Sequence, residues 1–246
     1  LDCEDSACIA YDMAAVDART RDTPFLDRVR FLWEGGVCPP VQFEAETSAL
    51  ERRDIAAIHG RVRGEDGGPL AGVHVDILHH PELGATLTRG DGAFDMAVVP
   101  GEALVVRFAF AGHISAQRSV RSYAGSYAST FDLELLRAAP GTVVDVSQGG
   151  VVRSDISEDA DGTRSATILF PVGVEARVRA GDGTMRPASS LRIRPREFTV
   201  GERGPERMVS TLPPASAYTY AIELGVNDGE DVFFDRPVPV YVTDFL

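Results

Sequence analysis

The sequence contains no lysine. Its 24 basic residues are all arginine, and 37 acidic residues leave the chain with a formal net charge of −13. Nucleic acids and anionic membrane surfaces bind proteins through clustered positive charge. The charge balance therefore predicts that this chain binds neither of them.

Long apolar runs are also missing. No stretch reaches the roughly 18 apolar residues of a membrane-spanning helix, so we expect no membrane span. The first five residues lack the basic start and the apolar core of a signal peptide. Because the chain does not begin with Met, both a removed leader and a fragment of a longer protein fit the sequence.

The sequence lacks the common signatures of catalytic sites. It has no Gly-x-Ser-x-Gly elbow, no His-Glu-x-x-His pattern and no Gly-rich phosphate loop. Acidic residues are abundant, but they occur in runs typical of a solvated surface. We therefore predict a protein that is not an enzyme, with no catalytic residue, no cofactor-binding residue and no metal-binding residue.

Cysteine is scarce: the chain has only Cys3, Cys8 and Cys38. Cys3 and Cys8 enclose four residues, and in an oxidising compartment they could close a small disulfide loop. Reduced thiols are the alternative. A zinc site is less favoured because it needs four ligands and a second cysteine pair is missing. Cys38 is either a buried thiol or the partner of one of the other two.

Two clusters have residue types that bind metals. His74, His79 and His80 are close in sequence, but adjacent residues of a strand point to opposite faces, which argues against one shared ion. The acidic run from Asp155 to Asp161 offers oxygen ligands for calcium. It lacks a closing bidentate glutamate, so we favour a solvated hairpin with an Asp-Gly turn at its tip.

Residues 89–91 spell Arg-Gly-Asp, a tripeptide that integrins recognise. The tripeptide lies in a Gly-Asp-Gly turn that a hairpin needs in any case. We therefore interpret it as structural, and we expect a positive φ at Gly92, which other residues resist.

Apolar and polar residues alternate with a period of two in many short segments, separated by turns rich in Gly, Asp and Pro. This pattern is typical of half-buried antiparallel strands. It recurs at residues 73–77, 94–98, 104–110, 174–179, 191–194, 218–224 and 238–242. The sequence therefore predicts an all-β fold with helix limited to short pieces. A break at residues 139–141 separates two sandwiches, and residues 1–54 form an irregular lead-in with a helical turn or two at 12–21.

Residues 60–94 resemble the transthyretin-like fold, which is also called the carboxypeptidase-regulatory-like domain. The resemblance is carried by Gly60-x-Val62, by Gly-Pro-Leu-Ala-Gly-Val at residues 68–73 and by Thr-x-x-Asp-Gly-x-Phe at residues 88–94. It implies a Greek-key sandwich over residues 55–139.

Residues 80–95 are more specifically similar to a stretch of bacterial RHS/YD-repeat proteins and of teneurins. Further segments follow in the order of that family, at residues 159–171, 196–201, 212–224 and 234–246. In such proteins a transthyretin-like domain precedes a fibronectin-like plug and a large YD-repeat shell. The resemblance implies that residues 140–246 are the plug and that the chain is a secreted or cell-surface protein.

The function implied by this resemblance is structural. The chain would cap or plug a shell that encloses a C-terminal cargo such as a toxin, with the YD-repeat shell as its partner and other protein chains as further candidates. The alternative is an accessory β-sandwich pair of a secreted carboxypeptidase-like enzyme or of an adhesin. Residues 240–246 are strongly apolar, so we predict that they dock onto a neighbouring shell; folding back into their own sandwich is the alternative.

Overall fold

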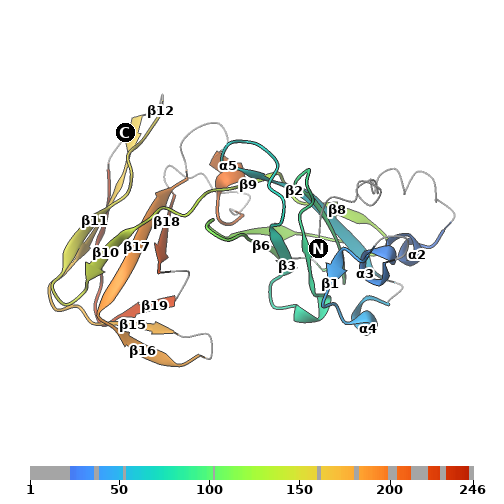
Figure 1. Ribbon diagram of the computed structural model, residues 1–246, viewed down its shortest axis with the longest axis horizontal. Helices are drawn as coiled ribbons and strands as arrows, with labels where there is room; N and C mark the ends of the chain where they lie inside the picture. The colour runs from blue at the N-terminus through green and yellow to red at the C-terminus, as the bar shows by residue number, and fades with distance from the viewer. Residues whose placement is uncertain are drawn as a thin grey trace. The chain divides into compact units, whose positions relative to one another are not determined.

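The computed structural model describes residues 23–35, 39–51, 54–101, 103–159, 162–179, 183–198, 204–211, 221–227 and 231–243 (Figure 1). Contacts between residues divide the chain into two compact units. Unit 1 contains Leu1–Arg137 and Val209–Pro213, and unit 2 contains Ala138–Met208 and Pro214–Leu246.

Unit 1 consists of short helices followed by strands. In chain order they are α2 (Phe25–Val29), α3 (Phe31–Glu34), β1 (Gln42–Phe43), α4 (Thr47–Leu50), β2 (Ala56–Gly64), β3 (His74–Ile77), the 3-10 turn η1 (Pro81–Leu83), β4 (Ala85–Leu87), β5 (Ala93–Val98), β6 (Leu104–Ala109), β7 (Ala116–Val120), β8 (Tyr127–Ser129) and β9 (Leu133–Leu135).

Two sheets enclose the core of unit 1. One has the order β1-β4-β3-β6-β7, and the other has the order β5-β2-β8, with β9 also paired to β2. Their inward side chains form a single apolar cluster, in which the rings of Phe94 and Phe108 meet edge to face at 5.5 Å between centroids. The ladders are antiparallel except those that join β2 to β8 and to β9, which are parallel.

The described part of the lead-in covers the outer face of β5. Phe25, Val29, Leu32 and Trp33 belong to the same buried cluster as the sheets, and α3 and β1 both contact β5. As a result every residue of β5 is buried, although half-buried strands are the usual outcome of an antiparallel sheet.

One buried side chain, Gln42, joins this lead-in to the sheets. Its Nε2 donates to the carbonyl oxygens of Leu83 (2.7 Å) and Ala97 (3.0 Å), and its Oε1 accepts from the backbone N–H of Ala97 (2.8 Å). The amide thus bonds both backbone groups that Ala97 presents at the edge of β5. It occupies the place that a neighbouring strand would otherwise take.

The turn before β5 has the geometry expected from Gly-Asp-Gly. Gly92 has a φ of +77°, which confirms the prediction of a positive φ. The Asp91 carboxylate accepts the backbone N–H of Ala93 at 2.9 Å, as aspartate commonly does in turns.

The outer edge of β7 is covered by residues 209–211, which come from a distant part of the chain. The Val209 carbonyl accepts the N–H of Gln117 at 2.7 Å, and Thr211 Oγ1 accepts the N–H of Ser119 at 3.0 Å. Unit 1 is therefore built from two separate stretches of sequence.

Unit 2 is built almost wholly from strands. In chain order they are β10 (Thr142–Asp145), β11 (Gly150–Arg153), β12 (Ser157–Asp159), β13 (Gly162–Arg164), β14 (Ala166–Phe170), β15 (Ala176–Arg179), β16 (Met185–Ala188), β17 (Ser190–Glu197), the short helix α5 (Gly204–Arg207), β18 (Ile222–Val226), β19 (Asp231–Phe234) and β20 (Val240–Val242).

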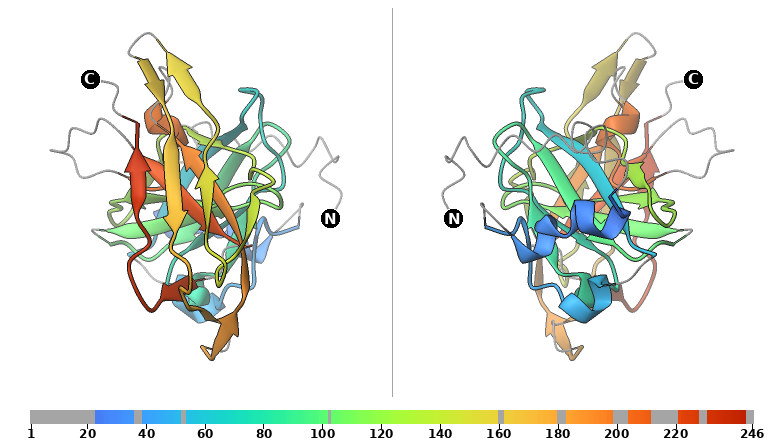
Figure 2. Two further views of the ribbon diagram at one scale, coloured as in Figure 1. Left: turned by 90° about the vertical axis from the view of Figure 1, so that its left-hand side faces the viewer. Right: turned by 90° about the vertical axis from the view of Figure 1, so that its right-hand side faces the viewer.

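The core of unit 2 lies between two three-stranded antiparallel sheets. Their orders are β10-β17-β18 and β11-β14-β20, and a third small sheet, β16-β15-β19, contributes further apolar side chains. β10 and β11 contact each other at one side of the sandwich. In the left view of Figure 2, β20, drawn in red, forms the outer edge of its sheet.

The predicted fold class is confirmed: most of the regular secondary structure of the described residues is β-strand. Each described helix has four or five residues, and none of them is long enough to cross a membrane. The helical turn expected at 12–21 lies outside the described residues. Residues 212–220, which include the start of the predicted strand at 218–224, and the last three residues of the chain also lie outside them.

Candidate functional site

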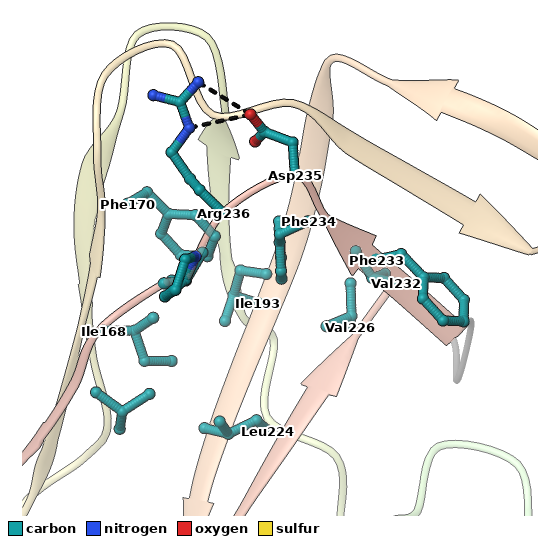
Figure 3. A pocket seen from close by; sticks show the side chains of 13 residues that line it. Ile168, Phe170, Ile193, Leu224, Val226, Val232, Phe233, Phe234, Asp235 and Arg236 are labelled. Atoms are coloured by element: carbon teal, nitrogen blue, oxygen red, sulfur yellow. Dashed lines mark hydrogen bonds and ion pairs between the residues drawn. The ribbon is translucent and has the colours of Figure 1, made fainter.

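Unit 2 contains an apolar groove of about 530 Å³ on its surface. Figure 3 shows side chains from several strands converging on this space. Its lining residues are Ile168, Phe170, Ile193, Leu224, Val226, Val232, Phe233, Phe234, Asp235, Arg236, Pro237, Val238 and Val240. We call this feature the β18–β20 groove, because those two strands each end a sheet and both line it.

The groove is an opening into the core of the sandwich. Val240 pairs with Ile168, and Val226 pairs with Ile193, so each edge residue shares a face with a buried core residue. Cross-strand partners project to the same side of a sheet. The edge side chains therefore face inward, yet Val240 remains 39% exposed and Leu224 40% exposed.

Aromatic packing marks the floor of the groove. The ring of Phe170, on β14, meets that of Phe234, on β19, edge to face at 5.9 Å between centroids. Both rings come from strands whose alternate residues face the core. An incoming apolar side chain would therefore find a preformed aromatic and aliphatic surface.

The charged residues of the groove lie together at one place. Arg236 Nε and Nη2 contact Asp235 Oδ2 at 3.0 and 2.9 Å (Figure 3). The hydrogen bond from Arg236 holds the pKa of Asp235 below its usual value, with a further contribution from the N–H groups that the carboxylate accepts. The pair is neutral as a whole, so the groove offers neither a net charge nor an acid at ordinary pH.

This arrangement offers an apolar surface for binding. The lining contains no nucleophile and no histidine, and its one carboxylate is held ionised by the neighbouring arginine. General acid–base chemistry needs a group whose pKa lies near the working pH. The groove can bury apolar surface, which contributes roughly 25 cal/mol per Å².

The histidines named in the sequence do not converge. His74 lies 3.5 Å from Asp76 on β3, and His80 Nδ1 lies 2.8 Å from Glu82 Oε1 in η1. The bond to His80 lowers the pKa of Glu82. His79 occupies a turn with a φ of +65°. Within the described part of the chain, no cluster of His, Cys, Asp and Glu is arranged to hold a metal.

The Arg-Gly-Asp tripeptide is engaged within its own unit. Arg89 Nη1 contacts the buried carboxylate of Asp95 at 2.6 Å. Burial raises the pKa of Asp95, and the attraction of Arg89 opposes that rise. The third residue, Asp91, caps the turn and lies 3.5 Å from Arg61. Both charged side chains thus make contacts within unit 1 at this turn, in line with the structural interpretation.

The structure describes only some of the other residues that the sequence analysis named as candidate ligands or disulfide partners. Ser157–Asp159 and Gly162–Arg164 pair as a hairpin, so the acidic run lies in the predicted type of structure. Asp161 and the cysteines Cys3, Cys8 and Cys38 lie outside the described residues, and the disulfide stays a prediction.

Sequence reasoning predicted an apolar docking edge at residues 240–246 but did not find the groove. Val240, Tyr241 and Val242 are all exposed, at 39%, 58% and 43%, while residues 244–246 lie outside the described residues. The alternating apolar residues of 222–226 and 238–242 were the available signal. The pattern showed which face is apolar, but not that this face borders an opening.

Comparison with known proteins identifies a domain in unit 1. Residues 50–128 match the family described as the teneurin TTR-like domain. Teneurin-1 of Gallus gallus is 36% identical over 96 residues, and teneurin-3 of Danio rerio is 39% identical over 71 residues. These matches cover 39% and 29% of this chain and 3% of each relative. They confirm the transthyretin-like and teneurin-like resemblance for this domain.

Similarity to solved structures is weak. A 3-chlorocatechol 1,2-dioxygenase from Rhodococcus opacus has a TM-score of 0.28 and 14% identity, covering 34% of this chain and 60% of that one. The Bacillus anthracis TIE protein has a TM-score of 0.30 and 10% identity, covering 78% of this chain and 31% of that one.

Proposed function

We propose that this chain is a non-catalytic structural and interaction segment of a larger secreted or cell-surface RHS/YD-repeat protein. Unit 1 supplies the transthyretin-like domain, and unit 2 supplies the plug-like sandwich that caps or plugs the shell around a C-terminal cargo. The observation that carries the proposal is the β18–β20 groove, an apolar opening into the core of unit 2.

An opening of this kind is a binding surface by its chemistry. Exposed apolar surface that continues into a core costs free energy in water, and a partner that covers it recovers that free energy. Val151 and Leu169, which pair across the outer face of the β11-β14-β20 sheet, are also exposed, at 48% and 38%. Unit 2 therefore offers apolar surface on both faces of this sheet.

The resemblance suggests the source of the partner. The chain spans about 3% of the teneurins that it matches, and the family order of segments puts a YD-repeat shell after a plug domain. A shell of the same polypeptide, intact or cleaved, is present at high effective concentration, so a modest apolar contact suffices to hold it.

The test begins with the open reading frame beyond Leu246. YD repeats there are expected; a reading frame without them, or one with a zinc-peptidase domain upstream of residue 1, contradicts the proposal. Hydrogen exchange is then compared between the full polypeptide and the 246-residue chain. We expect slower exchange across β18 to β20 in the full polypeptide, and equal exchange would contradict docking by unit 2.

A further inference from the structure

We propose that the β18–β20 groove accepts one extended, uncharged strand of the larger polypeptide, which pairs antiparallel with the free edge of β20. Alternate aliphatic side chains of that strand would enter the groove and complete the core of unit 2. This inference rests on the proposed function for the source of the strand.

The backbone of β20 presents hydrogen-bonding groups away from its sheet. The N–H of Leu169 donates to the carbonyl of Pro239, and the N–H of Thr243 donates to the carbonyl of Ser165. In an antiparallel ladder the bonded residues alternate with residues whose N–H and C=O point outward. The groups of Val240 and Val242 therefore point away from β14, toward the free edge.

β18 has the same property on the other side of the groove. The N–H of Phe198 donates to the carbonyl of Ala221, and the N–H of Asn227 donates to the carbonyl of Arg192. By the same alternation, the backbone groups of Leu224 and Val226 point away from β17. Two sheet edges thus flank the groove, and the described residues contain no strand that pairs with either edge.

Two other sheet edges are covered. In unit 1, the Gln42 amide bonds the edge of β5, and residues 209–211 bond the edge of β7. Exposed edges invite pairing with other chains, and proteins usually cover or charge them. β20 carries no charged residue, and its edge has no such cover among the described residues.

Proline does not block this edge. Pro239 lies opposite Leu169, so its missing N–H belongs to the side that faces β14. The outward positions are Val240 and Val242, which both retain an N–H. An incoming strand would find donors and acceptors in the regular spacing of a sheet.

The lining determines the chemistry of the occupant. Alternate side chains of a strand are separated by about 6.7 Å and project to one face. Those that face the groove would meet Ile168, Leu224 and Val232, among other apolar residues. A charged side chain would lose its hydration there without gaining a partner, because Asp235 and Arg236 already bind each other. The groove therefore favours uncharged, aliphatic residues at alternate positions.

A synthetic peptide tests this mode of binding directly. The probe is acetyl-Thr-Val-Thr-Val-Thr-Val-Thr-amide, whose valines can face the groove. In the antiparallel register, residues opposite Val240 and Val242 share their face and direct their own N–H toward β20. Methylating the valine amides should therefore weaken binding by about tenfold or more, since each lost hydrogen bond contributes roughly 1 kcal/mol. Methylating the threonine amides should change binding less than about twofold.

Two variants of the 246-residue chain provide matched controls. Val242→Lys places a charge on the inward face of β20 and should weaken peptide binding by about tenfold. Tyr241→Lys places the same charge on the opposite face of the same strand and should leave binding nearly unchanged. Both native side chains are about half exposed, at 43% and 58%, so neither variant disturbs a packed core. Circular dichroism checks that both fold.

The outcomes separate this inference from the proposed function. If both methylated peptides bind equally, or if the pattern is reversed, the groove is a general apolar site or pairs differently, and antiparallel strand addition is overturned. If the peptide fails to bind, but hydrogen exchange across β18 to β20 is slower in the full polypeptide, docking by unit 2 is supported and strand addition is overturned. If the probe binds as expected but the reading frame lacks YD repeats, strand addition stands and the proposed function falls.

Discussion

Replacing Gly92 with alanine should destabilise unit 1 by about 3 kcal/mol. Two costs add at this position. Gly92 has a φ of +77°, where a Cβ costs roughly 1–2 kcal/mol. A Cβ built there would also lie 2.4 Å from the carbonyl oxygen of Val62. That carbonyl accepts the N–H of Leu70 at 3.0 Å, so moving it weakens a hydrogen bond between neighbouring segments.

Two other glycines of unit 1 separate these costs. Gly112 has a φ of +75° but open space around its Cβ position, so Gly112→Ala should cost only about 0.5–1 kcal/mol after the entropy lost by the unfolded chain is counted. Gly90 lies in the same turn as Gly92, with no positive φ and nothing near its Cβ position. Gly90→Ala should be neutral or stabilising by up to about 1 kcal/mol.

The assay is thermal and urea denaturation followed by tryptophan fluorescence. Trp33 is the only tryptophan of the chain and is buried in the core of unit 1, so its emission reports that unit. Gly92→Ala should lower Tm by about 6–12 °C, Gly112→Ala by about 1–4 °C, and Gly90→Ala should not lower it. If Gly92→Ala lowers Tm no more than Gly112→Ala does, the close approach of Val62 to the turn is refuted.

Three further predictions concern particular side chains. Gln42→Leu should cost about 3 kcal/mol, because it leaves the Ala97 N–H and two carbonyls buried without their partner; unchanged Trp33 melting would contradict this. The pKa of Asp95, measured by NMR, should lie above the ordinary 3.8, because burial outweighs Arg89. Since folding raises this pKa, ionisation of Asp95 lowers the free energy of unfolding at neutral pH, and this destabilisation disappears as the pH falls through the folded pKa. A measured pKa at or below 3.8 would refute this prediction. Alkylation and mass spectrometry of protein from its natural compartment should find Cys3 and Cys8 unreactive until reduced, and three free thiols would exclude the disulfide.

Local sequence determined the strands and the turns. Alternation at residues 73–77 and 104–110 predicted β3 and β6, because one face of each strand packs on the core while the other meets water. The Asp91-Gly92 pair predicted its turn, because glycine adopts a positive φ without the steric cost that other residues incur. The transthyretin-like resemblance could also be recognised from the sequence, since these turns and strands carry it.

Only the tertiary structure decided what covers each strand. In the sequence, Gln42 is indistinguishable from an ordinary surface residue. It is buried and bonded to Ala97 only because β1 lies beside β5, which is more than fifty residues away in the chain. Arg89 becomes the partner of Asp95 only when the turn at residues 89–92 brings the two side chains together. The β18–β20 groove is the clearest case. A period of two shows which side chains face inward, but whether an edge has a neighbour depends on the packing of distant strands, which no local pattern encodes.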